Sequence, residues 1–140
     1  MGRILAVDYG SKRTGIAVTD PSQIIAGGLQ TVRTVDLMAF LKQYTTQENV
    51  DRIIIGMPKT MRGTLSENAG RIISFIQKFR NEFPSIPIEE YDERFTSVLA
   101  HRTMLDSGIS KKHRQDKALV DEISATIILQ SYMERKKNLK

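Results

Sequence analysis

Acidic side chains at separated places in the sequence have the types and surroundings that metal-dependent chemistry requires. Asp8 follows the apolar run 4–7, and strand alternation places its carboxylate on the core-facing row of that run. Asp92 and Glu93 follow a second apolar strand, 88–91. Alternation points these two acids to opposite sides, so only one of them can readily join Asp8.

Asp121 is the most informative acid, because it lies within the apolar stripe of a helix. At the helical period its face is shared by Ala118, Ala125, Ile128, Leu129 and Tyr132. A carboxylate that faces a core is unfavourable unless it is paired, hydrogen-bonded or bound to a metal ion. The simpler interpretation is an ion pair with Lys117, one turn earlier, but we favour a functional role.

Acids from two strand ends and one helix would converge on one pocket that has no cation of its own. Such a cluster raises its own pKa values unless a metal ion neutralises it. The chain has no cysteine, and its two histidines, His101 and His113, lack a partner at ligand spacing, so we expect surface roles for both. Oxygen ligands alone favour Mg²⁺ or Mn²⁺ over zinc, and two such ions would clamp the attacking and leaving oxygens of a phosphodiester.

Basic residues surround this acidic centre in the sequence. The 140 residues include 21 Lys and Arg against 16 Asp and Glu, a net charge of +5 that favours a polyanionic partner. Lys12 and Arg13 follow Asp8 closely enough to meet a phosphate. A second basic patch, at the foot of the acidic helix, comprises Lys111, Lys112, Arg114 and Lys117. The alternative for the run 111–114 is a solvated loop, whereas phosphate contacts would give salt-dependent affinity that is largely independent of sequence.

Length and composition predict one soluble α/β domain over residues 1–140. Hydrophobic residues make up 40% and charged residues 26%, which is ordinary for a globular protein. No apolar run approaches the roughly 18 residues of a membrane span, and the N-terminus lacks a signal-peptide pattern, so we expect a cytoplasmic protein without a membrane partner. The absence of cysteine excludes disulfide scaffolds and cysteine nucleophiles.

The predicted elements that position the acids change in order along the chain, from consecutive strands to alternating helices and strands. Apolar runs at 4–7, 15–19 and 24–32 predict an antiparallel meander, with a bulge at Gly27 and Gly28. Helices and strands then alternate, in this order: a helix capped by Asp36, the strand 52–56, a helix capped by Ser66, the strand 88–91, a helix from Thr96 or Ser97, and a helix over about 116–134 with a basic tail at 135–137. Strands separated by helices are expected to be parallel. The order predicts a mixed five-stranded sheet with helices on both faces.

Several separated motifs resemble the YqgF (RuvX) family, in the right order over nearly the whole chain. They are the segment Asp8–Asp20, Gly56-Met57-Pro58 with Gly63, the segment Asp92–Ser97, and the segment Lys117–Glu122. The first and third motifs are the specific ones. The resemblance implies an RNase H-like fold, which agrees with the strand order, and a nuclease of pre-16S rRNA 5′ processing related to Holliday-junction resolvases.

Carried onto this chain, the resemblance implies that Asp8, Glu93 and Asp121 are the metal-binding acids, with Asp92 as a candidate fourth. The chain departs from its resolvase relatives at the end of the fourth strand, where they carry an acid and this chain has Gly56-Met57-Pro58. The Asp92/Glu93 pair must then substitute from the next strand.

The sequence therefore predicts a nuclease of ribosome biogenesis that hydrolyses a phosphodiester of structured RNA with Mg²⁺ or Mn²⁺. Asp8 would anchor the metal ions, Glu93 and Asp121 would complete their coordination, and no protein nucleophile is needed. Arg94 is placed to pair with a neighbouring acid or to join the nucleic-acid-binding residues.

Three alternatives stay open at this point. A Holliday junction resolvase acting on branched DNA would work as a symmetric dimer, so the chain is expected to be a monomer or a homodimer. A nucleic-acid-binding module without turnover would use the same basic surface. Asp8-Tyr9-Gly10 followed by Gly15 also resembles the first phosphate loop of actin-like ATPases and sugar kinases, but those bind nucleotide between two such domains, and 140 residues supply one.

Overall fold

A twisted, mixed five-stranded sheet forms the centre of the molecule in the computed structural model, which describes residues 2–58, 68–96 and 117–138. The strands are β1 (Arg3–Tyr9), β2 (Arg13–Thr19), β3 (Ala26–Arg33), β4 (Val50–Met57) and β5 (Ile88–Asp92). Their order in the sheet is β3-β2-β1-β4-β5. The pairs β1–β2 and β2–β3 are antiparallel, and β1–β4 and β4–β5 are parallel. The predicted meander followed by parallel strands is confirmed.

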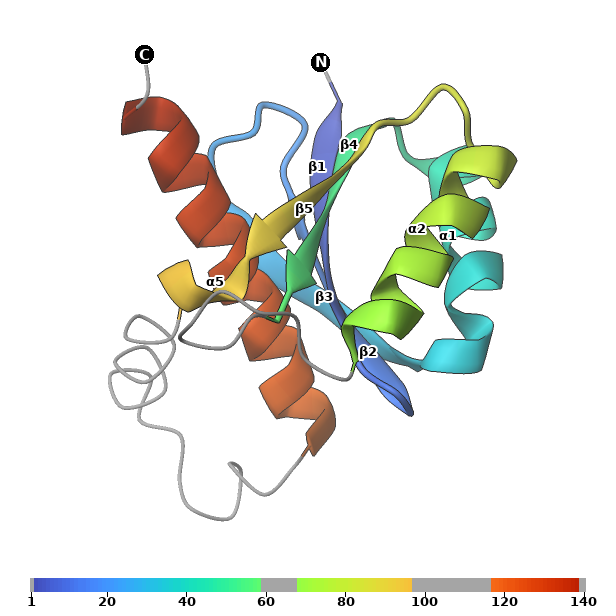
Figure 1. Ribbon diagram of the computed structural model, residues 1–140. Coiled ribbons are helices and arrows are strands. Elements are labelled where there is room, and N and C mark those ends of the chain that lie inside the picture. The colour runs from blue at the N-terminus through green and yellow to red at the C-terminus, as the bar shows by residue number, and fades with distance from the viewer. Residues whose placement is uncertain (1, 59–67, 97–116, 139–140) are drawn as a thin grey trace.

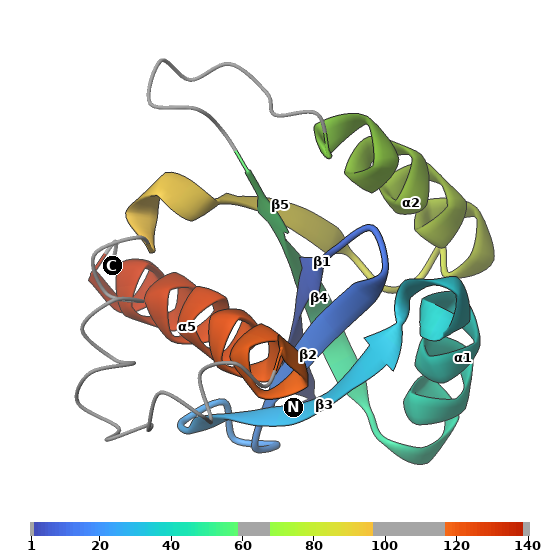
Figure 2. The ribbon, with the colours of Figure 1, turned by 90° about the horizontal axis from the view of Figure 1, so that it is seen from below.

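Helices cover both faces of this sheet (Figures 1 and 2). On one side lie α1 (Leu37–Gln47), entered through the 3₁₀ turn η1 (Thr34–Asp36), and α2 (Ala69–Glu82); on the other lies α5 (Lys117–Asn138). A second 3₁₀ turn, η2 (Glu93–Phe95), directly follows β5. No helix in the described ranges is long and apolar enough to span a membrane.

Side-chain alternation divides the buried residues into two cores, one on each face. Leu5, Val7 and Ile16 pack toward α1 and α2. Ile4, Ala6 and their neighbours pack against the buried stripe of α5, which includes Ala125, Ile128 and Leu129. The helix face predicted around Asp121 therefore is the one that meets the sheet.

Local details differ from the sequence prediction in two places, and a third detail, the bulge in β3, is as predicted. Asp36 precedes α1, but its side chain forms no capping hydrogen bond, because its backbone (φ −99°, ψ −1°) lacks the extended conformation of a capping residue. The basic tail 135–137 is not a tail, since α5 continues through it. The bulge in β3 is present, and the shifted register leaves Leu29 as the extra residue beside Gly28. Ser66, Ser97 and the helix expected after it lie outside the described residues.

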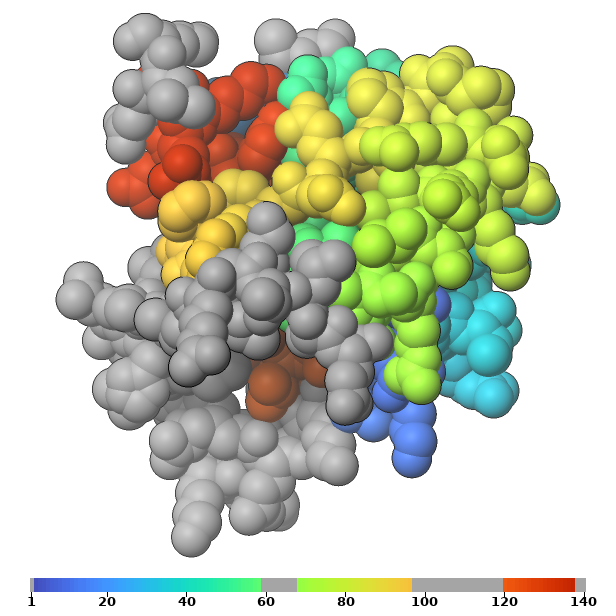
Figure 3. Space-filling model, viewed as in Figure 1, coloured from blue at the N-terminus to red at the C-terminus, as the bar shows by residue number. Residues whose placement is uncertain are grey.

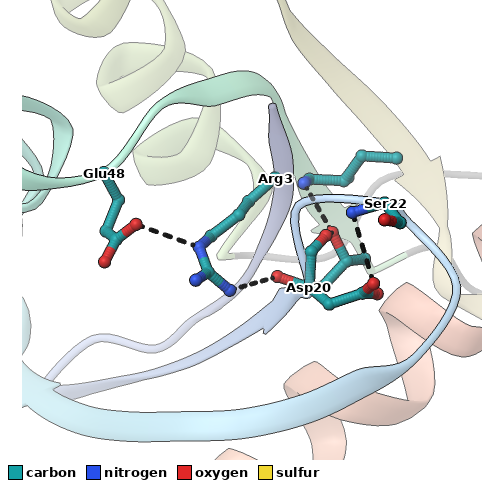
Figure 4. Close-up of polar contacts among 6 residues, drawn as sticks. Arg3, Asp20, Ser22 and Glu48 are labelled. Carbon is teal, nitrogen blue, oxygen red and sulfur yellow. Dashed lines mark hydrogen bonds and ion pairs between the residues drawn. The ribbon is translucent and has the colours of Figure 1, made fainter. Parts of the chain in front are cut away.

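The loop between β2 and β3 is held by the Asp20 carboxylate (Figure 4). It accepts hydrogen bonds from the backbone N–H groups of Ile24 (2.7 Å), Ile25 (2.8 Å) and Ser22 (3.2 Å), and these donors lower the pKa of Asp20. In the same region Arg3 donates to the Thr19 carbonyl at 2.9 Å and pairs with Glu48 at 3.3 Å. These contacts fix the beginning of β1, whose other end carries Asp8.

Candidate active site

Asp8 lies near the carboxyl end of β1 and faces α5, as alternation with Ile4 and Ala6 predicts. Its neighbour on β2 is Gly15. On β4 its neighbour is Gly56, one residue beyond the last registered pair, Val7 with Ile55. Asp8 is thus flanked by glycines on both sides, and the space above this row of the sheet is open to groups from other elements.

Glu93 enters this space from η2. Its carboxylate oxygen Oε1 lies 2.8 Å from where a Cβ at position 56 would stand. The Glu93 and Asp8 carboxyls share a hydrogen bond. Glu93 therefore reaches over β4 to Asp8, through room that exists because residue 56 has no side chain.

The two carboxyls hold a proton more tightly than ordinary acids. Burial raises the pKa of Asp8 to about 6, and the negative charge of Asp121 acts in the same direction, while the hydrogen bond from Glu93 opposes it. Burial likewise raises the pKa of Glu93 to about 7, reinforced by the charge of Asp8 and by the proton that Glu93 donates to it. Near neutral pH this pair shares a proton unless a cation replaces it.

Asp121 lies directly above Gly15, where the backbone of α5 approaches β2 closely. Its carboxylate pairs with Arg13, with 3.0 Å between Nε and Oδ2, and the two side chains are 40% (Arg13) and 23% (Asp121) exposed. The partner that the sequence suggested, Lys117, begins α5, but its side chain is not among those described. Arg13, which the sequence predicts to contact a phosphate, forms an ion pair with Asp121 in this structure.

Replacing Gly15 with alanine is expected to destabilise the fold by about 2–3 kcal/mol. The added Cβ would lie 2.0 Å from the Asp121 carbonyl oxygen, which is backbone and moves only if α5 moves. Urea unfolding measures the loss, and Gly27→Ala is the matched control, because a Cβ at Gly27 meets nothing within 4 Å. Equal stability of the two variants would contradict the close approach of α5 to β2.

Asp92 pairs with Arg94. Its oxygens accept from the backbone N–H of Arg94 at 2.9 Å and from its guanidinium at 2.6–3.1 Å. The predicted divergence of Asp92 and Glu93 is present, and Glu93 is the one that meets Asp8. Asp92 still acts on the site through its charge, which adds to the raised pKa of Glu93.

Two of the other predicted site residues, Lys12 and Arg94, are exposed, and the rest lie outside the residues that the structure describes. Lys12 is exposed in the β1–β2 turn, which Thr34 holds by donating to the Gly10 carbonyl at 2.7 Å and to the Lys12 carbonyl at 2.9 Å. Arg94 is exposed and paired with Asp92. The residues that fall outside the described ranges are Lys111, Lys112, Arg114, His101 and His113.

The donor set fits a hard divalent cation. Asp8 and Glu93 present carboxylate oxygens that share a proton, and a cation would remove both the repulsion and the need for that proton. Within the described ranges, no three acidic or histidine side chains are yet close enough to hold one ion. Asp121 is directed to Arg13. Asp8 and Glu93 are the residues that would hold such an ion, which would supply charge neutralisation at this place.

Two contributors to the site were missed from the sequence. The glycines at 15 and 56 make room for Asp121 and Glu93, and glycine inside an otherwise apolar strand is a known sign of close approach by another group. The Arg13–Asp121 ion pair joins residues 108 positions apart and had no local signal. Only the expected position of the helix over the sheet could have suggested it.

The strand order and the helix across the sheet define an RNase H-like fold. In agreement, the solved structure of Thermus thermophilus RuvC ("T. thermophilus RuvC in complex with Holliday junction substrate") has a TM-score of 0.61 over 97% of each chain, at 14% identity, which shows the shared fold. The RuvX family, described as "Holliday junction resolvase", matches residues 2–135. The chain belongs to the RuvX family.

Its curated relatives are similar over almost their whole length. The Bacteroides fragilis protein named "Putative pre-16S rRNA nuclease" is 61% identical over 98% of this chain and 99% of the relative. The Flavobacterium psychrophilum protein of the same name is 57% identical over 97% of this chain and 99% of the relative. Family membership thus places the chain among nucleases.

Proposed function

We propose that the chain is the nuclease of pre-16S rRNA 5′ processing in its cell, acting in the cytoplasm during ribosome biogenesis, and that it requires Mg²⁺ or Mn²⁺. The observation that carries the proposal is the Asp8–Glu93 pair with Asp121 beside it, on the face of the sheet that α5 covers. The names of relatives that are 53–61% identical over nearly the whole chain support the choice of substrate.

Asp8, Glu93 and Asp121 would hold the metal ions. Bound there, the ions supply an activated water and neutralise the charge that develops on the phosphodiester. The chain contributes the fixed geometry: β1 sets the position of Asp8, the turn after β5 sets Glu93, and α5 sets Asp121. Because Asp8 and Glu93 are largely shielded from water, their charges act more strongly on what binds between them.

Arg13 is proposed to exchange partners when the substrate arrives. Without substrate it neutralises Asp121, and a phosphate beside the β1–β2 turn would offer it a second anion. Lys12, exposed in the same turn, would contact the neighbouring phosphate. The exchange would release Asp121 to the metal site at the moment when the phosphodiester binds.

A side-by-side cleavage assay tests the proposal. Purified protein with Mg²⁺ or Mn²⁺ is given a pre-16S rRNA fragment and a four-way DNA junction, with EDTA as the metal-free control. We expect cleavage of the RNA at its 5′ end only when the divalent ion is present. Cleavage of the junction alone would instead identify a resolvase, the activity by which the family is described. Stoichiometric binding without any cleavage would identify a non-catalytic module.

Gly56→Ala is expected to lower the cleavage rate by about 10²-fold, because misplacing a catalytic group by about 1 Å has an effect of that size. The new Cβ would lie 2.8 Å from both Glu93 Oε1 and Ile128 Cδ1. These are the ends of flexible side chains, so they move aside and the unfolding free energy changes by less than about 1 kcal/mol. Rate and stability are measured on one preparation. A full cleavage rate would mean that Glu93 acts from another position.

A further inference from the structure

Phe95 is exposed beside the candidate active site. In the described part of the chain it is the one aromatic residue among the exposed large hydrophobic side chains, at 50% exposure. It closes the turn that begins with Glu93. Figure 3 shows this turn (gold) at the surface, against the C-terminal half of α5 (red). An aromatic ring in this position is available to a ligand that also reaches the acids.

The ring of Phe95 is held in place rather than free to turn. The Arg135 guanidinium lies over its face, 3.8 Å from the centroid, and Tyr91 packs against it with 5.9 Å between centroids. Tyr91 is fixed in turn by a 2.5 Å hydrogen bond with Ser131 and by edge-on contact with Tyr132. Because these contacts hold the ring in one orientation, a base that stacks on it would cost less conformational entropy than stacking on a ring without neighbours.

The charge around this ring suits a nucleic-acid strand. Arg135 and Lys136 are exposed, and Lys136 lies 5.9 Å from the ring centroid of Tyr132. Within the described residues, neither cation takes part in an ion pair. Aromatic rings and guanidinium planes next to free cations are what proteins use to stack unpaired bases while the cations follow the phosphates.

We propose that Phe95 and Arg135 form a stacking platform for an unpaired base of the RNA strand that passes through the active site. The inference rests on the proposed nuclease function and adds to it that the substrate is single-stranded next to the cleaved bond. From Ile128, which borders Glu93, to Arg135 the helix rises roughly 10 Å, the span of a few nucleotides. A base within a duplex is already stacked and paired, so it is not available to the platform.

The chain contains no tryptophan, which permits a direct test. Phe95→Trp, combined with Asp8→Asn to keep the strand intact, places a single fluorophore on the platform. We expect a single-stranded RNA oligonucleotide to quench it at the concentrations where fluorescence anisotropy shows binding, and a duplex of the same sequence to leave it unquenched. Absence of quenching by the bound single strand would overturn the proposal. Quenching by single-stranded DNA but not by RNA would overturn the assignment to RNA.

A second variant keeps the proposal testable if the tryptophan disturbs folding. Phe95→Leu retains an apolar side chain but no ring, and we expect single-stranded RNA to bind roughly tenfold more weakly while duplex binding changes less than about twofold. Phe40→Leu is the matched control, since Phe40 stacks on Tyr44 in α1 on the other side of the sheet. An equal loss for both RNA forms would assign Phe95 a structural role only.

The two proposals fail separately. Cleavage of pre-16S rRNA without base-dependent quenching would leave the nuclease function standing and remove the platform. Quenching and single-strand preference without any cleavage would retain the platform and remove the nuclease function.

Discussion

Asp8→Asn is expected to reduce metal-dependent cleavage by at least about 10³-fold. Metal ions contribute several kcal/mol of charge stabilisation to the transition state, and each 1.4 kcal/mol corresponds to a tenfold change in rate. Asparagine has the shape of aspartate but lacks its charge. Asp8 is the acid that contacts Glu93, and its pKa is raised by the charge of Asp121. Single-turnover cleavage of a pre-16S rRNA fragment measures the loss.

Two further acids provide the comparison. Glu93→Gln is expected to approach the effect of Asp8→Asn. Asp92→Asn is expected to change the rate less than about tenfold, because Asp92 pairs with Arg94, whereas Glu93 is the acid that contacts Asp8. Asp20→Asn, at the far end of β1, serves as the control for general effects of losing an acid. A wild-type rate in purified, folded Asp8→Asn would remove the proposed mechanism, and a larger loss in Asp92→Asn than in Glu93→Gln would reverse the assignment of the third acid.

Much of the fold was predictable because it depends on local periodicity. The apolar run of β1 and the apolar stripe of α5 both bury the residues that alternation and the helical period select. Ends of elements were less predictable. At Asp36 the residue type suits a cap, but the preceding 3₁₀ turn gives the backbone another conformation.

The candidate site was predictable in its residue types and less so in its contacts. The sequence indicates that Asp121 needs a partner, because it is a carboxylate in an apolar stripe. The partner, Arg13, lies in a distant turn that the helical pattern does not contain. At Gly56 the structure shows what the sequence pattern does not: Glu93 fills the space that a side chain at this position would occupy.

The metal-free protein is expected to lose stability as pH rises. The pKa values of Asp8 and Glu93 are raised to about 6 and about 7 in the folded state, so between roughly pH 4 and pH 7 the folded protein holds protons that the unfolded chain has released. The unfolding free energy falls wherever the folded state binds more protons. Each shift of about two units corresponds to about 3 kcal/mol, and for the pair we expect a decrease of order 3–5 kcal/mol.

Urea unfolding in EDTA at pH 5 and pH 8 measures this decrease. The double variant Asp8→Asn with Glu93→Gln cannot titrate at these positions, so its unfolding free energy should decrease little between pH 5 and pH 8. Asp20→Asn should retain the decrease in unfolding free energy between pH 5 and pH 8. The pKa of Asp20 is lowered in the folded state, so the contribution of Asp20 to stability is lost only as pH falls below the ordinary range of an aspartate. Equal stability of the wild type at both pH values would mean that the two carboxyls are not buried as a pair.

Mn²⁺ should reverse this loss of stability at high pH. An ion that binds the deprotonated carboxylates stabilises the folded state and displaces their proton, so the effect is larger at pH 8 than at pH 5. At subsaturating Mn²⁺ the cleavage rate should accordingly rise with pH through about 6 to 7, the range in which Asp8 and Glu93 lose their protons. A Mn²⁺-induced rise in melting temperature that is present in the wild type at pH 8 and absent in the double variant would identify the two acids as its ligands. The same rise in both proteins would place the ion elsewhere and leave the shared proton without a function in metal binding.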